Sequence, residues 1–115
     1  MKEYILFLRE GRPIGQKTQL ERKAEMVAWE AYLAQLSQGG YFIGGIPLAK
    51  WGSTITSSEI IARPVKSAKY GIIGDYLLII RAESHEKAVK LAEACPHISN
   101  TGSIEVREIV QMPAV

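Results

Sequence analysis

His97 and Asp75 are the acid and base pair that this sequence offers for proton transfer. An unperturbed histidine titrates near neutral pH, so His97 is a candidate general acid or base. Asp75 is the single aspartate of the chain, and its carboxylate would orient the imidazole. Two simpler interpretations stay open. His97 would cap the C-terminal end of the helix before it, and Gly74-Asp75 would form an ordinary turn.

Cys95 lies on the apolar face of the same predicted helix. A cysteine in such a place usually behaves as a small buried hydrophobic residue, and no neighbour in the sequence favours its thiolate form. We therefore expect a buried thiol rather than a nucleophile.

Arg9 and Arg81 each end a predicted strand and are the candidates for binding a carboxylate. If the two strands run parallel, both guanidinium groups project near the same edge of the sheet, where together they would hold a carboxylate ligand. The competing interpretation is a set of salt bridges with Glu10, with Glu83 or with a second copy of the chain.

Trp51 and Tyr76 are further candidates for lining a ligand cleft, although aromatic residues in a chain of this size commonly belong to a core or an interface. The edge with the two arginines should lie opposite the edge where His97 and Asp75 meet. We therefore expect at most one of these two groups of residues to form the site.

The composition excludes several classes of function. The chain has 115 residues, 47% of them hydrophobic, and a formal charge of +2, so it is one globular domain with no excess of charge for binding nucleic acid. A single cysteine forms no internal disulfide, and no cysteine and histidine cluster is present to hold zinc. We expect a cytoplasmic protein that needs no metal or other cofactor, and no membrane span or secretory signal is apparent.

Hydrophobic periodicity predicts two helices, four main strands and a hairpin. A capping box of Thr18 with Glu21 starts the first helix, and Ser84 is a suitable N-cap for the second. Trp51-Gly52 is expected to form a turn into the polar hairpin. The predicted ranges are strands 2–9, 41–48, 76–82 and 103–110, helices 19–38 and 85–94, and a hairpin whose second strand covers 59–65.

The first predicted helix carries two apolar stripes, which predict two neighbours: the sheet on one side, and another helix or a second subunit on the other. The bulkier stripe is Met26, Trp29, Leu33 and Leu36, and the second is Leu20, Ala24, Val27, Ala31 and Ala34.

The order of elements predicts an α+β fold of the ferredoxin-like, split βαβ type with a hairpin insertion, as a single domain over residues 1–115. Both faces of two strands are apolar: Ile5 and Phe7 alternate with other large residues in the first, and Leu77 and Ile79 do so in the strand 76–82. Two helices cover only one face of a sheet, so we expect a homodimer that stacks its uncovered faces.

Six segments of the chain match the pattern of a known family: residues 2–7, 26–29 with Leu36 and Gly40, 42–48, 74–76, 94–98 and 102–107. Through these segments the chain resembles the YCII-related proteins of the DGPF-domain branch, small bacterial proteins with the dimeric α+β barrel fold. One departure is clear: Ala62-Arg63-Pro64-Val65 stands where that family has Asp-Gly-Pro-Phe, so any role of that aspartate is absent. The parent YCII proteins use a histidine near the first strand, and Tyr4 to Arg9 contains none, so no catalytic residue is carried over.

Two functional hypotheses follow from the residues and the resemblance. The first is a cofactor-free barrel that binds a small anionic or aromatic molecule in the pocket between helices and sheet and transfers a proton on it. The alternative is a non-enzymatic homodimeric binding or accessory module.

Overall fold

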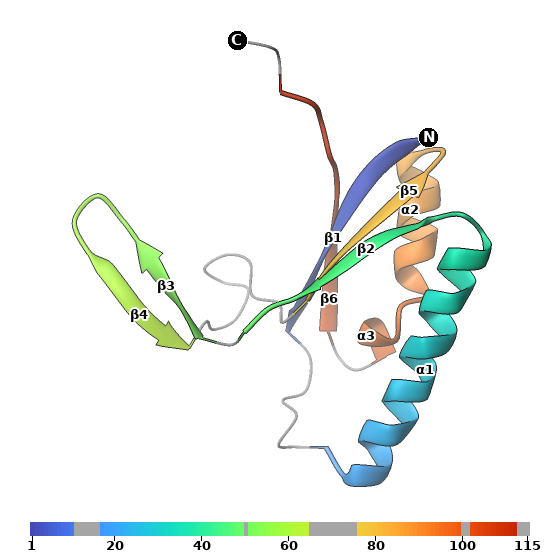
Figure 1. The fold of residues 1–115 in the computed structure, drawn as a ribbon, viewed down its shortest axis with the longest axis horizontal. Helices are drawn as coiled ribbons and strands as arrows, with labels where there is room; N and C mark the ends of the chain where they lie inside the picture. Colours follow the sequence, from blue (N-terminus) through green and yellow to red (C-terminus); the bar gives the residue numbers. More distant parts are fainter. Residues whose placement is uncertain (11–16, 50, 65–75, 100–101, 113–115) are drawn as a thin grey trace.

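The computed structural model describes residues 1–10, 17–49, 51–64, 76–99 and 102–112, which form a layer of helices on a four-stranded sheet, with a separate hairpin (Figure 1). The elements follow the predicted order of βαβ, hairpin and βαβ. In chain order they are β1 (Lys2–Glu10), α1 (Gln19–Gln38), β2 (Phe42–Pro47), β3 (Trp51–Ile55), β4 (Ile60–Pro64), β5 (Tyr76–Ala82), α2 (His85–Glu93), α3 (Pro96–Ser99) and β6 (Gly102–Glu108).

The strand pairing defines the fold class. The sheet has the order β2-β5-β1-β6, and each neighbouring pair is antiparallel. β1 and β2 therefore run parallel with β5 inserted between them, which is the split βαβ arrangement. The predicted α+β, ferredoxin-like fold with a hairpin insertion is confirmed.

Helix α1 begins and ends at the residues that the sequence predicts. The backbone N–H of Glu21 donates to Thr18 Oγ1 at 3.0 Å, and the N–H of Thr18 donates to the Glu21 carboxylate at 3.2 Å. These reciprocal bonds satisfy N–H groups that a helix otherwise leaves unpaired. At the other end Gly40 adopts a φ of 76°, which glycine tolerates without strain, and the chain turns into β2.

The core lies between the sheet and the helices. Alternate residues of the two central strands point to this side, and they pack on side chains from α1, from α2 and from Cys95, which lies two residues after α2. Fully burying a large apolar side chain contributes about 1.5–3 kcal/mol, so this face supplies most of the hydrophobic stabilisation. The buried core residues are Tyr4, Leu6, Leu8, Tyr32, Leu36, Leu78, Ile80, Ala82, Ala88, Ala92 and Cys95.

The bulkier stripe of α1 is only partly confirmed. Leu36 is buried, and Trp29 and Leu33 pack against the core at its margin, whereas Met26 is exposed. Tyr32, which lies outside the predicted stripe, is buried, and its hydroxyl donates to the Leu91 carbonyl of α2. Leu20 and Val27 of the second stripe are exposed, so no second neighbour covers them within the described chain.

The opposite side of the sheet, which we call the open face, carries no helix of the described chain (Figure 1). Strand register places the uncovered residues side by side, since Phe7 pairs with Leu77 and Ile5 pairs with Ile79. These four side chains are half-buried by their neighbours in the sheet. An apolar patch therefore runs across the two central strands, as the sequence predicts.

The β3–β4 hairpin forms its own two-stranded sheet and stands away from the main sheet (Figure 1). The predicted turn at Trp51-Gly52 is wrong, because both residues lie inside β3, where they pair with Pro64 and Arg63. The turn comes later, between Thr56 and Glu59, whose backbone groups are hydrogen-bonded at 2.8 Å. Among the helices described, none combines the length and the apolar character that a membrane span requires.

Candidate functional site

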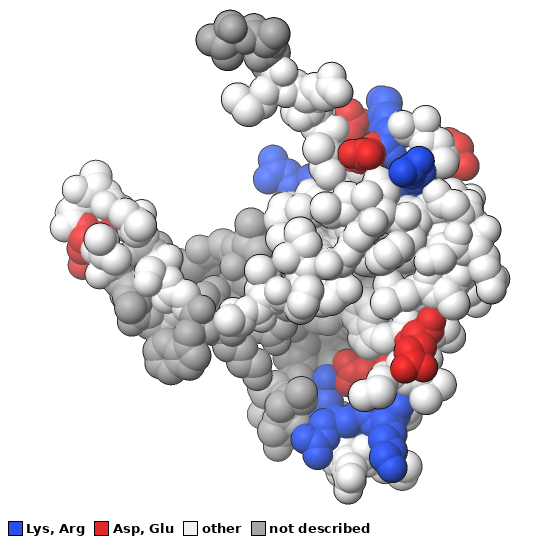
Figure 2. All heavy atoms as spheres, viewed as in Figure 1, with Lys and Arg blue, Asp and Glu red and all other residues white. Residues whose placement is uncertain are grey.

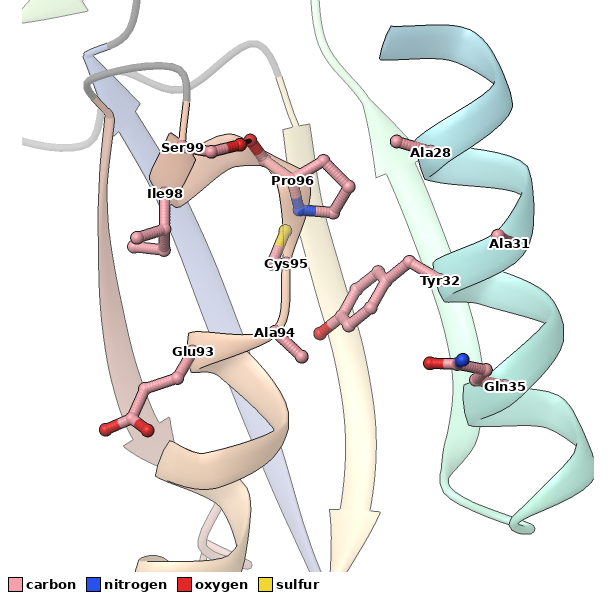
Figure 3. A pocket seen from close by; sticks show the side chains of 10 residues that line it. All are labelled: Ala28, Ala31, Tyr32, Gln35, Glu93, Ala94, Cys95, Pro96, Ile98 and Ser99. Atoms are coloured by element: carbon pink, nitrogen blue, oxygen red, sulfur yellow. Dashed lines mark hydrogen bonds between the residues drawn. The ribbon is translucent and has the colours of Figure 1, made fainter. Parts of the chain in front are cut away.

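Among the described residues, core side chains occupy the space between the helices and the sheet, and the predicted ligand pocket between these layers stays a prediction. The structure has a shallow groove of about 470 Å³ between α1 and the segment of α2 and α3 (Figure 3). Tyr32 reaches from α1 across the floor of this groove towards Ala94 and Cys95, while Glu93 points away from α1. The lining residues are Ala28, Ala31, Tyr32, Gln35, Glu93, Ala94, Cys95, Pro96, Ile98 and Ser99.

The two titratable groups at the floor of the groove stay neutral at physiological pH. The Tyr32 hydroxyl donates to the carbonyl of Leu91 at 2.7 Å, and burial raises its pKa well above the ordinary range. Burial also raises the pKa of the Cys95 thiol to about 11, although the backbone N–H of His97 opposes this shift. A nucleophilic cysteine needs its thiolate form, so Cys95 is a buried structural thiol, as the sequence predicts.

His97 lies in the short helix α3, which the sequence analysis missed because four residues give no periodic pattern. Its Nε2 atom is 2.7 Å from the backbone carbonyl oxygen of Arg9. A carbonyl oxygen only accepts, so Nε2 carries the proton and Nδ1 is the nitrogen left to act as an acceptor. The interpretation of His97 as a cap of the preceding helix is wrong, because Ala94 occupies the C-cap of α2.

Gly102 makes the position of His97 possible. A Cβ atom at residue 102 would overlap the imidazole ring of His97, so only glycine lets the first residue of β6 pass beneath the ring. The ring is therefore fixed both by a hydrogen bond to β1 and by the backbone of β6.

Arg9 belongs to the open face, at the end of β1. Its Nη1 atom lies 3.3 Å from Glu105 Oε1, and its guanidinium lies 5.7 Å from the centre of the Phe7 ring. The Arg9 side chain is only 17% exposed, and its Nε atom is buried without a hydrogen-bond partner among the residues that the structure describes. A buried guanidinium N–H without an acceptor is costly, so this atom is a donor that a bound acceptor would satisfy.

The predicted pairing of Arg9 with Arg81 is wrong. β1 and β5 are antiparallel, with Glu3 opposite Arg81, whereas Arg9 lies opposite Ser103 of β6. Six residues of an extended strand cover about 20 Å, so the two arginines lie at opposite ends of the open face. The physical reason is the split βαβ topology, in which the strand inserted between two parallel strands runs the other way.

Arg9 also lies at the same end of the sheet as His97, not at the opposite end as expected. The chain returns after α2 to the end of the sheet where β5 begins. This follows from two contacts: His97 is hydrogen-bonded to Arg9, and Leu8, the neighbour of Arg9, pairs with Tyr76, the first residue of β5. Asp75, its predicted partner, lies outside the described residues. The proposed His97–Asp75 pair therefore stays a prediction.

Tyr76 does not join Arg9. Tyr76 packs on the helix side, with its ring centre 5.8 Å from that of Trp29 and its hydroxyl against Gly45. Trp51 pairs through its backbone in β3, and its side chain lies outside what the structure describes. Arg81 and Tyr76 therefore lie away from Arg9, and the role proposed for Trp51 stays a prediction.

The structure adds two residues to the surroundings of Arg9 that sequence reasoning missed. Glu105 lies opposite Phe7, and Arg107 contacts the same carboxylate at 3.8 Å. In the sequence they alternate with the apolar Ile104 and Val106. Because alternate residues of a strand point to opposite faces, this pattern could have assigned them to the open face. We call Phe7, Arg9, Leu77, Glu105 and Arg107 the Arg9 site.

Charged side chains gather at two ends of the main body, and the surface between them is uncharged in the view of Figure 2. No group of three or more histidine, cysteine, aspartate or glutamate residues suited to a metal ion occurs among the described residues. The chemistry that the Arg9 site offers is thus a guanidinium beside an aromatic ring and a carboxylate, on an apolar surface.

Comparison with solved structures shows the same fold in an enzyme. The chain is similar to 5-chloro-2-hydroxyhydroquinone dehydrochlorinase (TftG) from Burkholderia phenoliruptrix AC1100, in a complex with 2,5-dihydroxybenzoquinone. The similarity has a TM-score of 0.56 and 18% sequence identity, and it covers 96% of this chain and 95% of the other. No protein-family model matches the chain, and no curated protein matches it.

Proposed function

We propose that this chain is a homodimeric protein of the YCII-related type that binds a small anionic molecule at the Arg9 site. The observation that carries the proposal is Arg9, which is nearly buried beside the ring of Phe7 and whose Nε atom has no hydrogen-bond partner among the residues that the structure describes. A guanidinium group binds carboxylates and other planar anions through two parallel hydrogen bonds, and an aromatic neighbour adds apolar contact.

The dimer rests on the surface that one copy leaves exposed. A compact monomer of 12.7 kDa exposes about 6,200 Å², whereas this chain exposes 8164 Å². The excess of about 1,900 Å² exceeds the roughly 800 Å² that each partner contributes to a stable interface. Stacking two open faces would bury Phe7 and Leu77 and enclose the Arg9 site between the sheets.

The solved neighbour supports a small-molecule ligand through its fold. The structure of that enzyme is a complex with 2,5-dihydroxybenzoquinone. A shared fold does not transfer a substrate, so the class of ligand proposed here rests on the residues of the Arg9 site.

A second candidate function is proton transfer on the bound molecule by His97. The supporting observation is that Nε2 of His97 donates to the Arg9 carbonyl, which leaves Nδ1 as the acceptor. Asp75 is the partner that we propose for this nitrogen from the sequence. Without such a step the chain would act as a binding module.

The test measures the affinity for benzoate and for 2,5-dihydroxybenzoquinone by calorimetric titration of the native chain and of two variants. Arg9→Gln should weaken binding at least tenfold, because it removes the charge and one of the two parallel donors. Arg22→Gln removes the same charge from an exposed position on α1 and should change nothing. Equal affinity in all three proteins, or no binding to the native chain, would contradict the proposal.

A further inference from the structure

The β3–β4 hairpin is well formed but has no support from the rest of the described chain. Its five residue pairs form a regular antiparallel ladder from Trp51 with Pro64 to Ile55 with Ile60. It shares no sheet with the other strands and projects away from them (Figure 1). Isolated two-stranded hairpins are only marginally stable in water, so this one is expected to have a packing partner.

The tip of the hairpin is a closed turn with an apolar pair behind it. Thr56 Oγ1 accepts hydrogen bonds from the N–H groups of Ser58 and Glu59 at 3.3 and 3.1 Å, which fixes the turn. Ile55 and Ile60 pair directly behind it and are 72% and 70% exposed. Residues paired across antiparallel strands point to the same face, so the two isoleucines form one exposed apolar surface.

The position of the hairpin indicates what covers this surface. The hairpin follows β2, which ends at Pro47 opposite Tyr76, and Tyr76 in turn lies opposite Leu8. It therefore leaves the sheet at the end that carries Arg9, at the border of the open face. The 15.7 Å radius of gyration exceeds the value of about 13 Å for a compact domain of this length, as expected for a chain with a projecting arm.

We infer that the β3–β4 hairpin is an arm that packs its Ile55 and Ile60 tip against the second copy of the chain. This inference rests on the dimer of the proposed function and adds a contact that stacked sheet faces alone do not supply. The excess exposed area of about 1,900 Å² is more than twice what one partner gives to an interface of standard size. An interface that includes the arms as well as the open faces would bury part of this excess.

The experiment compares dimer dissociation constants by sedimentation equilibrium. The test variant is Ile55→Thr with Ile60→Thr, which keeps β-branched residues in the hairpin and removes apolar surface. The control is Ile98→Thr, the same change at a 43% exposed residue of α3 in the helix layer. The double variant should raise the dissociation constant at least tenfold, and the control should leave it unchanged.

The outcomes separate the arm from the dimer itself. A monomeric native chain would overturn the proposed dimer. If the native chain is a dimer and the double variant has the same dissociation constant, only the inference about the arm is overturned. A tip that contacts a different protein would give this result. A second measurement is hydrogen exchange of the backbone amides of residues 51–55 and 60–64 in the native chain. Dilution below the dissociation constant separates the two copies, so the protection of these amides should then fall. Protection that does not change with protein concentration would overturn the inference.

Discussion

The imidazole of His97 is hydrogen-bonded to the backbone of β1 near the end of the strand, with Nε2 2.7 Å from the carbonyl oxygen of Arg9. The guanidinium of the same arginine belongs to the open face, where it contacts Glu105. The histidine of the helix layer thereby holds the backbone of the residue whose guanidinium we propose as the anion-binding group on the other side of the sheet. This relationship connects the core, the sheet end and the Arg9 site.

Gly102→Ala should destabilise the fold by about 1–3 kcal/mol, because the added methyl group overlaps the His97 ring. His97→Ala in the same chain removes that ring. The double variant should therefore lose less free energy of unfolding than the sum of the losses in the two single variants. Urea unfolding of the native chain, both single variants and the double variant measures this coupling. Strictly additive free energies of unfolding would mean that the ring does not occupy the space above Gly102.

Leu77→Asp and Leu78→Asp test which face of β5 is the interface. Leu78 is buried in the core, so an unpaired carboxylate there should abolish folding. Leu77 faces the open side and is half-buried, so Leu77→Asp should give a folded monomer if two copies stack through this face. Circular dichroism and light scattering distinguish the results. A folded Leu77→Asp dimer with native affinity would rule out stacking through the open face.

Element boundaries and the core face were predictable from sequence because both depend on local patterns. The capping box at Thr18 fixes the start of α1, and Gly40 ends it through its positive φ. Alternation in β1 assigned Tyr4 and Leu6 to one face without any knowledge of neighbouring strands. Local hydrogen bonding and side-chain period carry this information in the sequence itself.

Most of the site was not predictable because it depends on strand pairing. Arg9 meets Glu105 only because β1 and β6 pair in one register, which no local pattern encodes. The assumption of parallel strands placed Arg81 beside Arg9, although an inserted antiparallel strand moves it to the far end. His97 was correctly placed at the end where β5 begins, but its bond to a backbone carbonyl depends on α3, which is too short to be recognised.

The stability of the fold should fall as the pH rises from about 9 to 11, in part through Cys95. Burial raises the pKa of its thiol to about 11 from an ordinary value of 9.0, so the folded state keeps a proton that the unfolded state releases. The contribution of the thiol to the free energy of unfolding is complete below pH 9.0 and falls by about 2 kcal/mol by pH 11. Cys95→Ala should show a shallower decline in chemical unfolding across this range. The same slope in both proteins would mean that the thiol is not buried.

His97→Gln and His97→Ala separate a positioning role from a catalytic one. A glutamine amide N–H can donate to the Arg9 carbonyl as Nε2 of His97 does, whereas alanine leaves that carbonyl without its partner. If His97 positions Arg9, His97→Ala should weaken binding of 2,5-dihydroxybenzoquinone several-fold and His97→Gln should restore most of the affinity. Calorimetry measures the affinity of both variants, and light scattering shows whether the dimer is unchanged.

If His97 also transfers a proton, His97→Gln should bind the molecule normally but lose any turnover, because an amide does not titrate near neutral pH. Native affinity in His97→Ala would show that the bond between His97 and Arg9 has no part in ligand binding.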